Sequence, residues 1–268
     1  MLKPAGPENR WWHRGPAKSI LRSIMATTVV FVHGAFIADS AWWWHKVGNL
    51  LKMRGIESIP VDLPSCGDNA AQCTLADDVN AVRAAIERAD GPVILVGHSY
   101  GGIVITEAAA DNPKVDHLVY MSAVVPDGTS VLEADFTNPN DVPKFDIRPD
   151  GTASEGGTKT GVITALPDKE LAEGALKRLT RQAILPFTEV SNGRAWADVP
   201  STFVVCTQDE DIQIDRQRAH AERCGRVVDI PTNHFAHLER PDLVTAVLVN
   251  IAEEQLAPTT AAAARATS

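Results

Sequence analysis

The segment Gly97-His98-Ser99-Tyr100-Gly101-Gly102 lies between the apolar run Val93–Val96 and the helix-like stretch Ile103–Asp111. G-x-S-x-G between a strand and a helix is typical of a sharp turn that lifts a nucleophilic serine above a sheet edge. A tight turn with an ordinary surface serine is the alternative, but the context on both sides favours the nucleophile. We therefore predict a nucleophilic Ser99, near a helix N-terminus whose N–H groups favour a developing anion.

The alternation of strand and helix extends along the chain on both sides of this turn. Short runs rich in β-branched residues, the pattern of strands covered on both faces, are Thr28–Val32, Ser58–Leu63, Val93–Val96, Leu118–Ser122, Thr202–Cys206 and Val227–Ile230. Helical stretches between them are Ala41–Arg54, Leu75–Ala89, Gly101–Asp111, Ile214–Arg223 and Asp242–Gln255. This alternation predicts right-handed βαβ units, so the fold class is α/β, with a mostly parallel sheet flanked by helices.

The segment from about residue 129 to 199 interrupts the alternation. It contains many Pro and Gly residues and one predicted helix, Asp168–Gln182. Because it is too long for a plain loop, we predict an insertion over the carboxyl ends of the strands, where α/β ligand sites lie, which acts as a lid or cap. Its apolar residues, such as Phe145 and Phe187, are candidates either for the pocket lining or for the packing of the cap itself.

The two ends of the chain differ from the part between them. Residues 1–24 carry five basic residues and one acidic residue, with no strand or helix period and no apolar run typical of a signal peptide. We predict a flexible extension over 1–24, a single domain over 25–257 and a disordered Ala/Thr-rich tail over 258–268. Met25 is our hypothesis for the natural start.

Composition excludes several classes of protein. The formal net charge of −9 argues against a nucleic-acid partner, and the chain contains no apolar stretch long enough to span a membrane. The four cysteines are too few and too scattered for a disulfide scaffold, although a Cys66–Cys73 bridge stays open. Reduced thiols are typical of a cytosolic protein, so we expect a cytoplasmic location.

A serine nucleophile needs a base, and the base needs an acid that orients it. In this architecture the expected order along the chain is Ser, then Asp or Glu, then His. The strand Thr202–Cys206 is followed by Asp209-Glu210-Asp211, and Val227–Ile230 is followed by His234. We predict His234 as the base and Asp209 as the acid, with Asp211 as the second candidate; His237, three residues on, suits packing better.

A third element follows the first strong strand. Gly34 and Ala35 are small enough to let backbone N–H groups approach a substrate oxygen, and with the N–H of Tyr100 they form a candidate oxyanion hole. An ordinary glycine turn is the alternative. We expect Phe36, His98 and Phe235 to contact the substrate. The chain lacks G-x-G-x-x-G, a P-loop and H-E-x-x-H, so neither a cofactor nor a metal ion is implied.

Four segments together resemble the α/β-hydrolase superfamily over roughly 27–257, and in particular its cofactor-free branch of plant methyl-ester esterases, hydroxynitrile lyases and small bacterial esterases. They are HGAF at 33–36, VDLPSCG at 61–67, VGHSYGG at 96–102 and VCTQD at 205–209. The resemblance implies a triad of Ser99, Asp209 and His234, and oxyanion donors at Ala35 and Tyr100. It also implies the mostly helical cap. Lyases of this branch carry threonine where Gly34 stands and lysine where Phe235 stands, so the resemblance favours an esterase.

These patterns predict a serine hydrolase that acts on small carboxylic esters or lactones through an acyl-enzyme. A ligand receptor that keeps the triad but turns over slowly or not at all is the alternative from another class. Perhydrolase or other acyl-transfer chemistry on the same serine is a third hypothesis. The sequence leaves open the natural substrate and the choice between monomer and homodimer.

Overall fold

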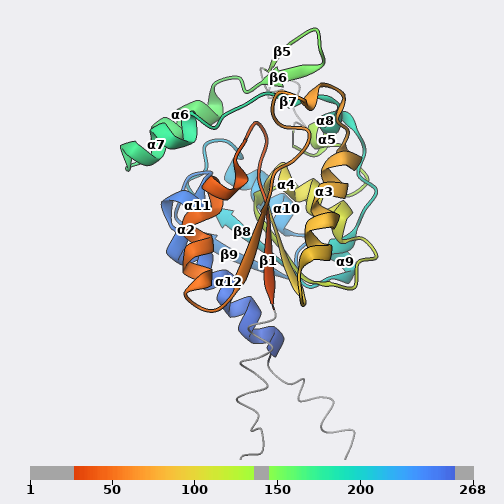
Figure 1. The fold of residues 1–268 in the computed structure, drawn as a ribbon, viewed down its shortest axis with the longest axis vertical. Helices are drawn as coiled ribbons and strands as arrows, with labels where there is room; N and C mark the ends of the chain where they lie inside the picture. The colour runs from red at the N-terminus through yellow and green to blue at the C-terminus, as the bar shows by residue number, and fades with distance from the viewer. Residues whose placement is uncertain (1–26, 136–144, 257–268) are drawn as a thin grey trace, which may run out of the picture.

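The computed structural model describes residues 27–135 and 145–256; the predicted extension 1–24 and tail 258–268 lie outside them. A six-stranded sheet in the order β2-β1-β3-β4-β8-β9 forms the centre (Figure 1), and all its strands are parallel. The strands are β1 (Thr28–Val32), β2 (Glu57–Val61), β3 (Val93–Ser99), β4 (Val115–Ala123), β8 (Ser201–Cys206) and β9 (Arg226–Ile230). The predicted α/β class and mostly parallel sheet are confirmed.

Helices cover both faces of this sheet because successive side chains of a strand point to opposite sides. Val29 and Phe31 of β1 pack in one apolar cluster, and Val30 and Val32 in the other. The first cluster is covered by α2 (Ser40–Lys52), α11 (Ala236–Glu239) and α12 (Pro241–Leu256). The second is covered by α3 (Leu75–Arg88), α4 (Gly101–Ala109), α9 (Ala195–Asp198) and α10 (Ile214–Ala221) (Figure 1).

Local signals fix the helix boundaries. Thr74 and Asp77 form a capping box at the start of α3, and the Asp39 side chain accepts from the Trp42 N–H at the start of α2. β3 extends three residues beyond the predicted Val93–Val96 because His98 and Ser99 pair with β4. Strand pairing thus overrides the weak strand propensity of Gly97 and His98.

The region over the carboxyl ends of the strands combines short helices with a second sheet (Figure 1). Its described elements are α5 (Val131–Asp135), β5 (Asp146–Ile147), β6 (Thr152–Ser154), α6 (Thr158–Thr164), α7 (Lys169–Leu176), β7 (Gln182–Ala183) and α8 (Leu185–Thr188). The antiparallel sheet β5-β6-β7 was not predicted, since strands of two or three residues are too short to show a period. We call residues 129–199 the cap.

The cap helix predicted over Asp168–Gln182 is shorter in the structure. It begins at Lys169, with the Asp168 side chain capping it, and ends at Leu176. Beyond it, the Thr180 N–H donates to the Phe36 carbonyl, and the chain continues into β7. Contact with the core therefore ends this helix before Gln182.

The structure also bears on the cysteines and on the length of the helices. All four cysteines are free thiols, so the Cys66–Cys73 bridge is absent. The short 3-10 helix η1 (Ala70–Gln72) lies between them. Within 27–135 and 145–256, no helix combines the length and the apolar character needed to cross a membrane.

Candidate active site

Ser99 is the last residue of β3, at the sharp turn into α4, where only glycine fits at three nearby positions. Its φ of 53° lies in the left-handed region, a strained conformation for a serine. A Cβ on Gly97 would lie 2.6 Å from the Gly101 carbonyl oxygen, and one on Gly102 would lie 2.2 Å from the Val124 carbonyl oxygen. The glycines of the motif thus let the turn pack tightly against its neighbours, and this packing holds Ser99 in its strained conformation.

His234 follows β9, and its ring is completely buried. Its Nδ1–H donates to Asp209 Oδ2 over 2.9 Å, and Asp209 lies in the loop after β8. The structure therefore brings the predicted base and the predicted acid together. With the proton on Nδ1, the neutral ring presents a lone pair at Nε2, as a general base requires.

The Asp209 carboxylate is held by further donors. Oδ1 accepts from the backbone N–H groups of Asp211 and Ile212, and Oδ2 accepts from the Ser122 hydroxyl and the Gln217 amide. Burial opposes the charge, but the His234 ring and these hydrogen bonds together lower the pKa of Asp209 below its ordinary value. Asp209 therefore stays ionised at neutral pH, with its oxygens fixed.

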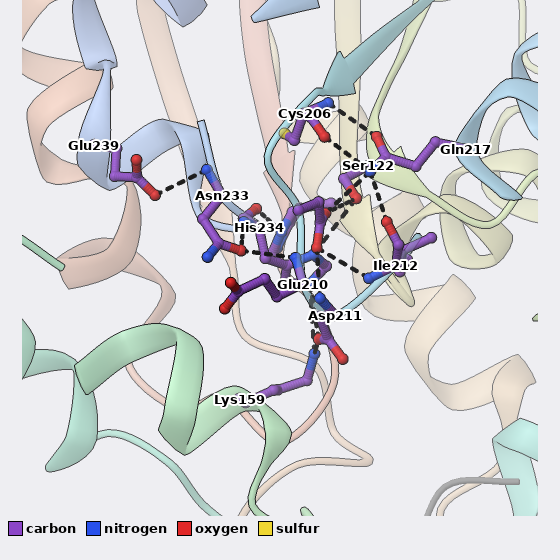
Figure 2. A network of polar contacts seen from close by, with 12 residues as sticks. Ser122, Lys159, Cys206, Glu210, Asp211, Ile212, Gln217, Asn233, His234 and Glu239 are labelled. Atoms are coloured by element: carbon purple, nitrogen blue, oxygen red, sulfur yellow. Dashed lines mark hydrogen bonds and ion pairs between the residues drawn. The ribbon is translucent and has the colours of Figure 1, made fainter. Parts of the chain in front are cut away.

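The Nε2 side of His234 has two charged neighbours (Figure 2). Asp211 Oδ2 lies 3.3 Å from Nε2, and Lys159 Nζ, from cap helix α6, lies 3.5 Å from it. No hydrogen bond joins Nε2 to Ser99 among the described residues. Sequence reasoning considered Asp211 only as an alternative to Asp209 and missed Lys159, for which the sequence offers no local signal.

The candidate oxyanion hole lies where the loop after β1 packs against the turn of Ser99. A Cβ on Gly34 would lie 2.9 Å from Ser99 Cβ, so the two segments are in close contact. Within the described ranges, the N–H groups of Ala35 and Tyr100 have no hydrogen-bond acceptor. The next N–H, of Phe36, is occupied because it donates to Gln182 Oε1 over 2.9 Å. Two buried donors thus stay available beside Ser99.

A buried polar network holds the loop after β1 and the turn of Ser99 in place. Asp78 of α3 accepts from the Tyr100 hydroxyl and from the N–H and hydroxyl of Ser65. Gln182 of β7 donates to the Ser65 hydroxyl while its oxygen accepts from Phe36. The sequence held one signal for this network, since Asp78 lies on the apolar face of a helix among Leu75, Val79 and Val82.

The three predicted substrate contacts lie inside the protein. The Phe36 ring packs against Phe145 and Phe187, and the Phe235 ring packs against Trp43 and His98. His98 Nε2–H donates to the His234 carbonyl oxygen, and burial lowers the pKa of His98 well below its ordinary value. In this structure all three side chains make packing contacts, so their contact with a substrate stays a prediction.

Residues 27–135 and 145–256 contain no cluster of three or more His, Cys, Asp or Glu side chains that could hold a metal ion.

A family model described as the alpha/beta hydrolase family matches residues 29–247. The chain is 29% identical to the alpha/beta hydrolase nvfD of Aspergillus novofumigatus over 75% of this chain and 87% of that protein. It is 26% identical to polyneuridine aldehyde esterase of Rauvolfia serpentina (84% and 95% covered) and 27% identical to methylesterase 8 of Arabidopsis thaliana (86% and 91% covered).

Solved structures share the fold. A pyrethroid hydrolase from Sphingobium faniae aligns with a TM-score of 0.71 at 22% identity, covering 87% of this chain and 99% of that one. Polyneuridine aldehyde esterase aligns with the same TM-score and identity, covering 84% and 98%. The resemblance inferred from the four sequence segments is therefore confirmed, and the chain belongs to the alpha/beta hydrolase family.

Proposed function

We propose that this protein is a serine hydrolase that cleaves small carboxylic esters or lactones through an acyl-enzyme on Ser99. The observation that carries the proposal is the buried 2.9 Å pair of Asp209 and His234 at the same edge of the parallel sheet as a serine in a strained turn. The two free N–H groups next to Ser99 add the electrostatic part of the same machinery. The relatives named as esterases support ester hydrolysis as the class of reaction.

In the proposed mechanism, His234 Nε2 takes the proton of Ser99 as its hydroxyl attacks the ester carbonyl. Asp209 holds the Nδ1–H and stabilises the imidazolium that forms. The N–H groups of Ala35 and Tyr100 donate to the developing oxyanion, and one such donor is worth about 3–4 kcal/mol in known hydrolases. The imidazolium then protonates the leaving alcohol, and a water activated by the same nitrogen releases the acid.

One observation favours the second candidate function, a receptor with slow turnover or none. His234 Nε2 contacts Asp211 and Lys159, and among the described residues no hydrogen bond joins it to the Ser99 hydroxyl. Catalytic hydrogen bonds are often formed only when substrate is bound, so this arrangement is also compatible with turnover. A kinetic measurement separates the two functions.

We would follow the release of nitrophenolate from 4-nitrophenyl acetate and butyrate, comparing the wild type with Ser99→Ala. A serine hydrolase gives steady turnover that Ser99→Ala abolishes, while the control Ser58→Ala, on strand β2, keeps it. A fluorophosphonate should label the wild type once, on the peptide that carries Ser99. Unchanged turnover in Ser99→Ala would refute the mechanism, and one burst without turnover would favour the receptor.

Four further points stay predictions from the sequence: no nucleic-acid partner, no membrane partner, a cytoplasmic location, and a state of monomer or homodimer.

A further inference from the structure

Lys159 is a buried lysine that extends from the cap into the candidate active site (Figure 2). It belongs to helix α6, and its side chain is 9% exposed. Its ammonium donates to Asp211 Oδ2 over 2.5 Å and lies 3.5 Å from His234 Nε2. Taking a lysine out of water costs free energy unless the charge is paired, and here Asp211 supplies the pair.

Three charged groups face the His234 ring. Asp209, after β8, contacts Nδ1, whereas Asp211 from the same loop and Lys159 from the cap lie at Nε2. The ring centroid of His98, in β3, lies 4.5 Å from that of His234, and the ring centroid of His237, in α11, lies 4.9 Å from that of His98. Burial lowers the pKa of both, that of His237 to about 3, so both are neutral at ordinary pH. The charge at Nε2 is therefore set by Asp211 and Lys159.

Asp211 alone would oppose the function of a base. A carboxylate 3.3 Å from Nε2 stabilises the protonated ring, and a protonated His234 cannot accept the Ser99 proton. Burial raises the pKa of Asp211, but the Lys159 ammonium and then the His234 ring outweigh it and lower that pKa to about 2. Asp211 is thus an anion at neutral pH, and the positive charge of Lys159 compensates its negative charge.

We propose that Lys159 is a positioning residue, whose ammonium holds the Asp211 carboxylate and so keeps the His234 ring neutral and available to Ser99. This inference rests on the proposed hydrolase function and names a residue of the cap that tunes its base. Lys159 belongs to the cap and Asp211 to the loop after β8. Their ion pair therefore makes the protonation of His234 depend on the position of the cap relative to that loop.

The test is the pH dependence of kcat/KM for 4-nitrophenyl acetate. Lys159→Met leaves Asp211 uncompensated, so the acid limb should move to higher pH by about 1–3 units, the effect of an opposite charge at this distance. Asp211→Asn leaves the ammonium uncompensated, so the limb should move to lower pH. The double variant Lys159→Met/Asp211→Asn should return close to the wild-type profile, and Lys159→Arg should keep that profile.

Two matched controls each remove one charge from the same segments, the cap and the loop after β8, at residues for which no contact with His234 is found. Lys169, also in the cap, donates to the carbonyl oxygens of Thr164 and Leu166, so Lys169→Met tests the loss of a cap lysine as such. Glu210, exposed and next to Asp211, tests the loss of an acid from the same loop through Glu210→Gln. Neither variant should move the acid limb.

The His234 ring can also be observed directly by following its nitrogen resonances through a pH titration. Lys159→Met should raise the midpoint of that titration and Asp211→Asn should lower it. This measurement stands even if the wild type proves inactive, so failure of the hydrolase proposal and failure of this inference are distinguishable. Lys159→Met could instead lower kcat/KM equally at every pH and leave unchanged both the midpoint of the acid limb and the midpoint of the His234 nitrogen titration. That result would show that Lys159 only holds the cap in place, and it would overturn the proposal. A Lys159→Met shift that the double variant retains would overturn it too.

Discussion

Asp209 and Asp211 contact opposite nitrogens of the His234 ring, although only two positions separate them in the chain. Asp209 Oδ2 is 2.9 Å from Nδ1, and Asp211 Oδ2 is 3.3 Å from Nε2. The loop after β8 folds back on itself at this point, since the Asp211 N–H donates to Asp209 Oδ1 over 2.7 Å. In the proposed mechanism these two chemically identical side chains have opposite effects on His234. Asp209 orients the ring as a base, whereas Asp211 stabilises the protonated ring, which cannot accept the Ser99 proton.

This geometry predicts very different outcomes for the two amide substitutions. Asp209→Asn should lower kcat by about 10⁴-fold at neutral pH, since an amide group facing Nδ1 favours the wrong tautomer of His234. Asp211→Asn should keep most of the turnover there, because it leaves Nδ1 untouched. Nitrophenolate release measures both, and the circular dichroism spectra of the two variants serve as the control for folding. A larger loss in Asp211→Asn would reverse our assignment of the acid.

The contact between Gln182 and Phe36, 146 positions apart, predicts that the cap supports the oxyanion segment. Gln182→Leu leaves the buried Phe36 N–H without its acceptor, which costs about 1–3 kcal/mol of the free energy of unfolding. We also expect a lower kcat/KM, because the neighbouring Ala35 N–H loses its support. Urea denaturation measures the first effect, and Gln72→Leu, on an exposed site, is the control. Equal midpoints for the two variants would contradict this role.

Asp78 predicts an unusual pH dependence of stability. Burial raises the pKa of this carboxyl above its ordinary value, although hydrogen bonds from Ser65 and Tyr100 lower it in part. A raised pKa in the folded state means that the contribution of Asp78 is fully present below its unfolded pKa and is lost as pH rises through the folded value.

Asp78→Asn reproduces the neutral acid and does not titrate. The difference in unfolding free energy between the wild type and Asp78→Asn should therefore shift in favour of the variant as pH rises from about 4 to neutrality. Urea denaturation at several pH values measures that difference. A difference that is constant with pH would show that the carboxyl titrates alike in both states.

A pair of glycine substitutions tests the packing of the turn. Gly102→Ala places a methyl group 2.2 Å from the Val124 carbonyl oxygen, so the turn of Ser99 must shift. Both stability and turnover should fall. Gly161→Ala, in helix α6, meets no atom within 4 Å and should stabilise the protein by about 0.5–1 kcal/mol. Thermal unfolding compares the two variants, and equal melting temperatures would argue against the steric explanation.

Much of the fold was readable because its signals are local. The β-branched runs, the amphipathic helices and the glycines around Ser99 each depend on neighbours within a few positions. The structure has a strand or helix in each strand and helix segment predicted outside the cap, although the bounds differ by a few residues. The predicted candidates Ser99, Asp209 and His234 lie at or just after strand ends, and carboxyl ends of parallel strands meet at one edge of a sheet. The positions of these three residues at the ends of parallel strands therefore place them in the same region of the fold.

The tertiary structure alone decided which atoms meet there. The resemblance in VCTQD at 205–209 favours Asp209 as the partner of Nδ1. The contact itself depends on how the loop that carries both Asp209 and Asp211 folds back. Lys159 and Gln182 enter from the cap, 75 and 146 positions from His234 and Phe36. Contacts over such separations leave no periodic signal, because they arise when independent segments pack together. The sequence thus determined the sheet, the turn and the order of the reactive groups, and packing determined the charges around the base.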